Sequence, residues 1–379
     1  MPRRGNTLRK TGIEECIIKK LEIMAHNLNF NERTGKYSFF SVKETPWHNL
    51  GQVVSEHPTS AEAIRHAGLD YEVIKQPIYI KGQGLSVGKN GEIRGEDIPI
   101  PDQFGTMRTD TNEPFGVVGK DYHIVQNTEA FAFFDAIVGG GDGIQYETAG
   151  ALGCGERIFI TAKLPGYIRV GNGDDVTEKY IFLSNKHDGK GSIIAAFTPI
   201  RVVCQNTLNA ALGNMSNVVR IKHTTGVKQR LEDAHRVMGI ADRLSVQMEG
   251  LFNRWAKTPI TDNEVKKLIQ LALCPNKETF ELLKKGADDE LSTLFKNTCN
   301  DAFSYAMMSD TQLMDTTRGT VYGAYNCITG YYQNVRPYKD EEEKFKSVLL
   351  GGTAMERGQK AFDLCLGFEK EGAAIFKLN

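Results

Sequence analysis

Hydrophobic and polar residues alternate in short runs through the first half of the chain, and glycine or proline separates the runs. A period of two is typical of β-strands, because successive side chains point to opposite faces of the sheet. The turn Gly171-Asn172-Gly173 predicts a hairpin, and Pro77 predicts an edge or bulged strand. Strands are predicted at residues 37–43, 71–81, 104–109, 115–118, 122–125, 144–149, 157–164, 167–170, 179–184, 192–198, 200–204 and 217–223.

Beyond residue 226 the spacing becomes that of helices. Between Lys228 and Lys257, apolar or small residues recur at alternating intervals of three and four, which places them on one helix face. Ser245 interrupts this seam, so we expect it to pack on the protein's own sheet or helices; a homo-oligomer formed through residues 228–257 is the alternative. Thr261 begins a capping box, and Gly286 ends the next helix. Other helices are predicted at residues 128–138, 206–212, 290–308, 320–335, 341–350 and 353–366.

These patterns predict an α+β fold, with a β-rich region that holds a mixed or antiparallel sheet and a mainly helical C-terminal region. The β-rich region is expected over residues 24–226, and the helical region packed on it over residues 227–379. Residues 1–23 carry six basic and three acidic side chains. We interpret them as a disordered or non-native extension upstream of a natural start at Met24, with a basic arm for nucleic acid as the alternative.

Composition limits the classes of partner. Lys and Arg total 46 and Asp and Glu total 47 among 379 residues, so the net charge of -1 gives no overall attraction for a polyanion. Any nucleic-acid surface must therefore be a local patch. The 7 cysteines form no C-x-x-C pair, which argues against a disulfide framework and a Cys-rich zinc site. No run is long and apolar enough for a membrane span or a signal peptide, so we expect a cytoplasmic protein without a membrane partner.

Residues 184–223 place polar side chains inside runs that otherwise resemble buried strands. His187 and Asp188 lie on a turn next to Gly189, while Arg201 and Asn206 interrupt or follow apolar runs. Burying such groups without partners is unfavourable, so we expect them to bond to each other or to face a ligand.

A local basic patch is the main functional signal. Residues 214–230 contain several basic side chains and no acidic one. Alternation places Arg220 and Lys222 on one strand face, and Arg201 is expected in alignment with them on a neighbouring strand. Such a face could follow a phosphodiester backbone, with Phe197, Tyr180 or Tyr167 stacking on bases. The predicted nucleic-acid or ligand-binding residues are Lys186, His187, Asp188, Arg201, Asn206, Arg220, Lys222 and His223.

Catalytic interpretations have weaker support in the sequence. His187-Asp188 resembles the metal-binding pair of some phosphohydrolases, but it lies on a predicted turn and not on a helix. Cys204 could act as a nucleophile with His223 and Asn206, yet it ends an apolar strand where a buried inert thiol is usual. No phosphate-binding glycine loop is present. We therefore assign no catalytic residue, no metal ligand and no cofactor.

Several motifs together resemble a known family. They are F-F-S-V-K-E-T-P-W-H-N-L-G, S-N-K-H-D-G, T-P-I-R-V-V-C-Q-N-T-L and G-T-V-Y-G-A-Y-N-C-I-T-G-Y-Y-Q-N-V-R-P. In this order they are similar to the phage and plasmid-like proteins grouped as domain of unknown function 932, over residues 24–376. The resemblance implies a phage, prophage or plasmid as the source and a bacterial cytoplasm as the location. It implies no activity and no catalytic residue.

Three hypotheses follow. The first is a nucleic-acid-binding accessory protein that binds or anneals single-stranded DNA during replication or recombination. The second is a hydrolase or nuclease that uses a cluster of His187, Asp188, Arg201 and His223. The third is a structural or host-interaction protein of a mobile element. The local basic patch favours the first.

Overall fold

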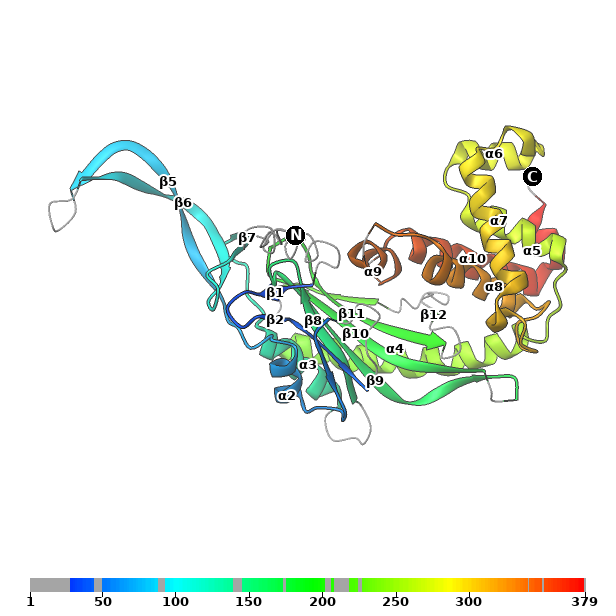
Figure 1. The fold of residues 1–379 in the computed structure, drawn as a ribbon, viewed down its shortest axis with the longest axis horizontal. Helices are drawn as coiled ribbons and strands as arrows, with labels where there is room; N and C mark the ends of the chain where they lie inside the picture. The colour runs from blue at the N-terminus through cyan, green and yellow to red at the C-terminus, as the bar shows by residue number, and fades with distance from the viewer. Residues whose placement is uncertain are drawn as a thin grey trace, which may run out of the picture.

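The computed structural model confirms the α+β class, with sheets in the N-terminal half and helices mainly in the C-terminal half (Figure 1). It describes residues 28–43, 50–87, 93–138, 145–172, 175–201, 206–207, 218–223, 227–339, 341–349 and 351–377. The basic extension, Cys204 and residues 208–212 of the predicted helix lie outside these ranges. Asn206 and Thr207 form a short strand, so this end of the predicted helix is wrong.

An eight-stranded sheet forms the centre of the molecule, in the order β12-β11-β10-β9-β8-β3-β4 with β13 also paired to β11. All pairs are antiparallel except β3 with β4, which agrees with the predicted mixed or antiparallel sheet. Hairpin connections join β8, β9, β10 and β11 in succession, which explains the antiparallel pairing in that part of the sheet. The bounds are β3 Phe39–Val42, β4 Gln52–Val54, β8 Gln145–Leu152, β9 Arg157–Val170, β10 Asp175–Lys186, β11 Ile193–Arg201, β12 Asn206–Thr207 and β13 Val218–Ile221.

The two faces of this sheet enclose different hydrophobic clusters. Ile158 and Leu183 point into the main core, while their neighbours Phe159 and Phe182 point into a smaller cluster on the other face. The alternation follows from the pleat of the strands. The smaller cluster also contains Leu28, Phe39, Leu152 and Ala196, with Leu349 of the C-terminal region packed against it.

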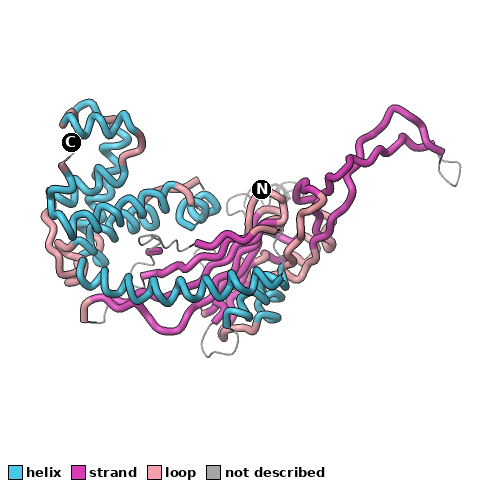
Figure 2. The backbone as a smooth tube through the Cα atoms, turned by 180° about the vertical axis from the view of Figure 1, so that it is seen from behind, coloured by secondary structure: helices cyan, strands magenta, loops and turns pink. Residues whose placement is uncertain are grey.

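Helix α4, Val227–Trp255, covers the main-core face of the sheet (Figure 2). It packs against α3 (Asn127–Val138) and against β9, β11 and β13. The part of its seam from Ala241 to Trp255 is buried, and the rings of Phe252 and Trp255 contact the C-terminal helices at Tyr322, Tyr325 and Phe362. This confirms packing on the protein's own sheet and helices. This part of the seam is thus occupied within the chain, and the structure gives no support to a homo-oligomer formed through it. A shorter helix, α2 Ser60–His66, contacts α3 and β8.

The C-terminal helices gather around α8, in which every residue is buried. The predicted capping box at Thr261 and the left-handed Gly286 are both present, with a φ of 67° at the glycine. A segment of π-helix at Tyr331–Val335 follows α8. None of the helices in the described ranges is long and apolar enough to cross a membrane. The bounds are α5 Asp262–Leu273, α6 Lys277–Lys285, α7 Thr293–Met308, α8 Val321–Gly330, α9 Glu341–Leu349 and α10 Thr353–Glu371.

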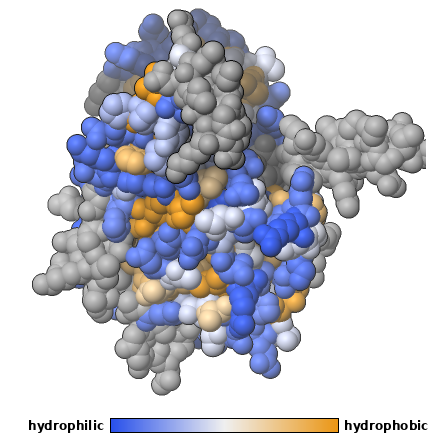
Figure 3. Space-filling view, turned by 90° about the vertical axis from the view of Figure 1, so that its left-hand side faces the viewer, coloured by the Kyte–Doolittle hydropathy of each residue, from blue (hydrophilic) through white to orange (hydrophobic). Residues whose placement is uncertain are grey.

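A long hairpin of β5 (Val73–Val87) and β6 (Ile93–Arg108) projects from the body as an arm (Figure 1). Strand β7, Pro114–Gly119, pairs only with the base of the arm. The irregularity predicted at Pro77 is confirmed, because the register shifts between Pro77 and Tyr79. The length of the arm was not predicted, since the prolines and glycines of β6 obscure its alternation. Around the end of the molecule that carries the arm, hydrophilic surface surrounds small hydrophobic patches (Figure 3).

Two further short strands, β1 Phe30–Asn31 and β2 Lys36–Tyr37, pair with each other next to the sheet.

We predict that Trp255→Ala destabilises the fold by about 3–5 kcal/mol, because it removes a fully buried ring. This ring contacts Tyr325 and Phe362, and its Nε1 donates to Glu369 at 3.1 Å. Urea unfolding measures the change. Val246→Ala is the matched control on the same helix: its side chain is 75% exposed, so we expect a change within about 0.5 kcal/mol. Equal losses for both variants would contradict the described packing of α4.

Candidate anion-binding site

Strand register brings basic side chains together at one end of the sheet. Arg157 of β9 lies directly opposite Lys186 of β10, and Arg220 of β13 lies directly opposite Ile194 of β11. Ser184, two residues before Lys186, is also opposite Ile194. Directly opposed residues in an antiparallel pair share a face, as do residues two apart in one strand. These side chains therefore all lie on the face that carries the smaller hydrophobic cluster.

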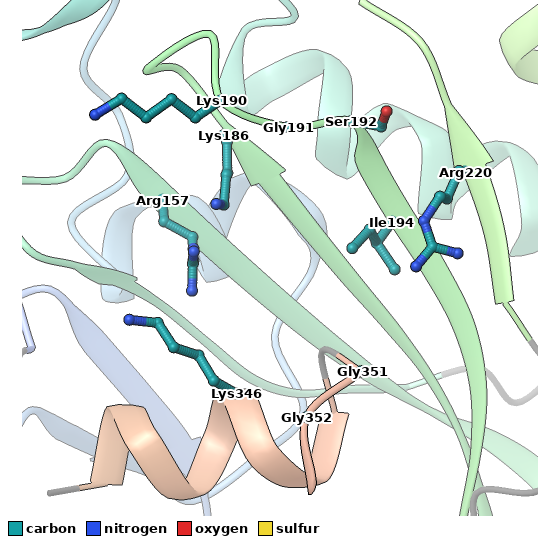
Figure 4. A pocket seen from close by; sticks show the side chains of 10 residues that line it. All are labelled: Arg157, Lys186, Lys190, Gly191, Ser192, Ile194, Arg220, Lys346, Gly351 and Gly352. Atoms are coloured by element: carbon teal, nitrogen blue, oxygen red, sulfur yellow. The ribbon is translucent and has the colours of Figure 1, made fainter. Parts of the chain in front are cut away.

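Helix α9 completes a cavity over this end of the sheet. Leu349 packs against the smaller cluster, and Lys346, one turn earlier, faces the basic residues of the sheet (Figure 4). The cavity has a volume of about 540 Å³, and none of the described residues that line it is acidic. The lining consists of Arg157, Lys186, Lys190, Gly191, Ser192, Ile194, Arg220, Lys346, Gly351 and Gly352.

The side chains of Arg157, Lys186 and Lys346 point toward one another, whereas Arg220 lies beyond Ile194 and Lys190 extends away (Figure 4). Nη1 of Arg157 is buried and has no hydrogen-bond partner within the described structure. Such an unpaired charged donor is unfavourable unless an anion accepts from it.

The pKa of Lys186 is lowered, first by partial burial and then by the positive charge of Arg157. Lys346 acts in the same direction, and the carboxylates of Asp188 and Glu156 act in the opposite one. Asp188 accepts a hydrogen bond from the backbone N–H of Lys190, and Glu156 accepts one from the backbone N–H of Cys154. Neither carboxylate belongs to the described cavity lining. The cavity thus holds an excess of positive charge that a bound anion would stabilise.

Two glycines leave room for this arrangement. A Cβ at Gly191 would lie 3.1 Å from Cδ of Lys186, so the lysine stem lies closely over the glycine. A Cβ at Gly352 would lie 2.6 Å from Cα of Ser347, which only glycine tolerates at this close approach of α9 and α10. Gly352 is also the N-cap of α10 and offers no side chain for a cap, so Oγ of Ser347 accepts from the N–H of Ala354 instead. The positive end of the α10 dipole therefore adds to the field at the edge of the cavity.

The predicted histidines lie on the opposite side of the sheet. Because side chains alternate, His187 points into the main-core face while Lys186 points into the cavity. His187 is fully buried, and its Nε2 lies 2.9 Å from Oδ1 of Asn127. The amide nitrogen of Asn127 donates to the carbonyl of Leu69, so Oδ1 is the acceptor and Nε2 carries the proton. His223 is buried as well and stacks on Tyr122 at 4.7 Å.

These contacts connect the turn after β10 to the segment around Tyr122 and to the arm. Tyr122 donates to the carbonyl of Lys186, and Asn185 donates to the carbonyl of Val125. Thr106, at the base of the arm, donates to the carbonyl of His187. The polar residues of this turn therefore stabilise tertiary structure, and the cavity lies behind them on the other face.

The remaining predicted site residues do not all gather at the cavity. Arg220 and Lys222 are exposed while Ile221 between them is buried, which confirms that they share a face; Lys222 lies outside the cavity lining. The predicted alignment of Arg201 with Arg220 is wrong. Arg220 pairs with Ile194 near the start of β11, whereas Arg201 is the last residue of β11 and pairs with Asn206. The two positions are therefore seven residues apart along β11. The hydrolase hypothesis requires Arg201 close to His187, Asp188 and His223, and the register places Arg201 at the far end of β11 instead.

The aromatic candidates for base stacking are likewise absent from the described cavity lining. Phe197 is fully buried in the main core, so its predicted role is wrong. Tyr180 donates to a carboxylate oxygen of Glu178, and Tyr167 is opposite Glu178 at the other end of the sheet. In the described ranges, no group of His, Cys, Asp and Glu side chains is arranged to hold a metal ion.

Arg157 and Lys346 were not predicted as site residues. Arg157 begins a predicted strand, and only the register of β9 with β10 shows that it lies opposite Lys186. Lys346 is distant in sequence, and only the packing of α9 on the sheet brings it to the cavity. Alternation in the sequence gave no signal for either contact.

The model of the family described as domain of unknown function (DUF932) matches residues 114–349, more than half of the chain. The chain belongs to the DUF932 family. This confirms the family that the motifs predicted, although the matched range begins after the first of those motifs. All the basic residues of the cavity lie within the DUF932 range. Neither the curated proteins nor the solved structures gave a match.

We predict that His187 makes stability depend on pH. Burial, and to a smaller extent His223, lowers the pKa of His187 from 6.5 to about 3. Between these values the unfolded chain binds the proton and the folded one does not, so stability falls as pH decreases below 6.5. The loss should be about 1 kcal/mol per pH unit.

Urea unfolding of the native protein and of His187→Gln, at about pH 7 and about pH 5, measures this effect. Gln keeps an N–H donor for Asn127 and does not titrate, so the variant should lose less stability over this range. Equal losses in the two proteins would show that His187 is not the titrating group.

Proposed function

We propose that this DUF932 protein binds single-stranded nucleic acid, with the strand's phosphates in the basic cavity. The cluster of Arg157, Lys186, Arg220 and Lys346 in a chain of net charge -1 is the observation that carries the proposal. Neutralising phosphates with lysine and arginine releases counterions and supplies most of the affinity of sequence-independent binding. The resemblance to phage and plasmid-like proteins supports an accessory role in replication or recombination, in the bacterial cytoplasm.

The shape of the cavity favours a single strand over a duplex. The end of the sheet forms one wall, and α9 with the turn at Gly351 and Gly352 forms the opposite wall (Figure 4). A flexible strand can bend into this space, whereas a duplex is a wide, stiff rod. Because the described lining contains no aromatic residue, the cavity itself should contact the backbone and show little sequence preference.

We predict that Arg157→Gln with Lys186→Gln reduces affinity for a short single-stranded DNA of mixed sequence by at least about tenfold. Fluorescence anisotropy at low salt measures the affinity. The native protein should weaken with rising salt, with a log–log slope of about -0.7 for each phosphate contacted, and the variant should have a shallower slope.

Lys284→Gln provides the matched control, because Lys284 is exposed on α6 and does not line the cavity. It should keep the affinity and the salt slope of the native protein. Failure of the native protein to bind at low salt would contradict the proposed function. Unchanged binding by the double variant would contradict the assignment of the cavity as the contact surface.

A further inference from the structure

The cavity contains two regions of positive charge that differ in density. At one end, Arg157, Lys186 and Lys346 converge from two strands and a helix (Figure 4). Toward the other end, Arg220 stands alone beyond Ile194. One strand, β11, separates β10 from β13, so the backbones of Ser184 and Arg220 are about 10 Å apart, and Lys186 lies two residues further along β10. Arg220 is thus set apart from the three convergent cations, with Ile194 between them (Figure 4).

The end of the cavity where Arg157, Lys186 and Lys346 converge favours a ligand that carries more than one negative charge. A phosphodiester inside a strand carries one negative charge. A terminal phosphate carries about -1.5 to -2 at neutral pH and has three strong acceptor oxygens. No described lining residue is acidic, and the nearby carboxylates of Asp188 and Glu156 act on Lys186 from outside that lining. Nη1 of Arg157 is buried without an acceptor in the described structure. A terminal phosphate offsets this charge better than a phosphodiester and offers an oxygen to each cation.

We propose that Arg157, Lys186 and Lys346 bind the terminal phosphate of a nucleic-acid strand, while Arg220 contacts the next phosphodiester. This inference rests on the proposed function and adds to it the substrate class, a phosphorylated strand end. Gly352, at the N-terminal end of α10, lines the same cavity, and the positive end of the helix dipole favours the same charge.

The test compares single-stranded DNAs of one sequence that carry a 5′-phosphate, a 3′-phosphate or hydroxyl groups at both ends. Competition anisotropy should show that one of the phosphorylated strands binds about tenfold more tightly than the hydroxyl strand. The preference should decrease when the pH is lowered from about 7.5 to about 5.5, because the second pKa of a terminal phosphate is about 6. A closed circular strand should bind no better than the hydroxyl strand.

Two variants separate the two regions of the cavity. Lys346→Gln should weaken binding of the phosphorylated strand more than binding of the hydroxyl strand, and so remove most of the preference for the phosphorylated end. Arg220→Gln should weaken all strands by a similar factor and keep the preference. If Lys346→Gln fails to fold, as judged by circular dichroism, Lys186→Gln replaces it with the same expected loss of preference.

The outcomes distinguish this inference from the proposed function. Salt-dependent binding of all strands with equal affinity would overturn the assignment of a terminal phosphate and leave single-strand binding standing. Absence of binding to every strand at low salt would overturn the proposed function itself. A preference that persists unchanged in both Lys346→Gln and Lys186→Gln would place the end-binding site elsewhere and overturn this inference.

Discussion

The alternation of side chains along β10 determines how this molecule is organised. Successive residues of a strand point to opposite faces, so Lys186 and His187 are neighbours in sequence but belong to different environments. His187 and Asn185 take part in the buried contacts that hold the turn against the main core. Lys186 points to the other face and lines the basic cavity. One motif therefore contributes to stability on one face and to the candidate site on the other.

Hydrophobic packing holds the positive charges of the cavity together. Leu349 of α9 packs against the small cluster that contains Phe159 and Phe182, and this contact positions Lys346 opposite Arg157 and Lys186. Repulsion between these cations opposes the docking of α9 on the sheet. A bound anion would remove that repulsion, so binding and the position of α9 should be coupled. The helix is thus both a wall of the cavity and a source of its charge.

Local signals in the sequence predicted the elements, and they could not predict the contacts between distant elements. The seam of α4, the capping box at Thr261 and the ending at Gly286 depend on neighbours within one or two turns, and all three are present. The shared face of Arg220 and Lys222 was predicted by alternation alone. Register is a long-range property: it places Arg157 opposite Lys186 and separates Arg201 from Arg220. Lys346 lies on α9, more than a hundred residues after the strands of the cavity, and it reaches the cavity only because α9 packs on the sheet.

A crystal structure of the protein with a short single-stranded DNA shows directly whether the strand lies in the basic cavity. We expect a phosphate of the strand in the cavity, within hydrogen-bond distance of the guanidinium group of Arg157 and of Nζ of Lys186. A strand bound on another surface, with the cavity free of phosphate, would contradict it.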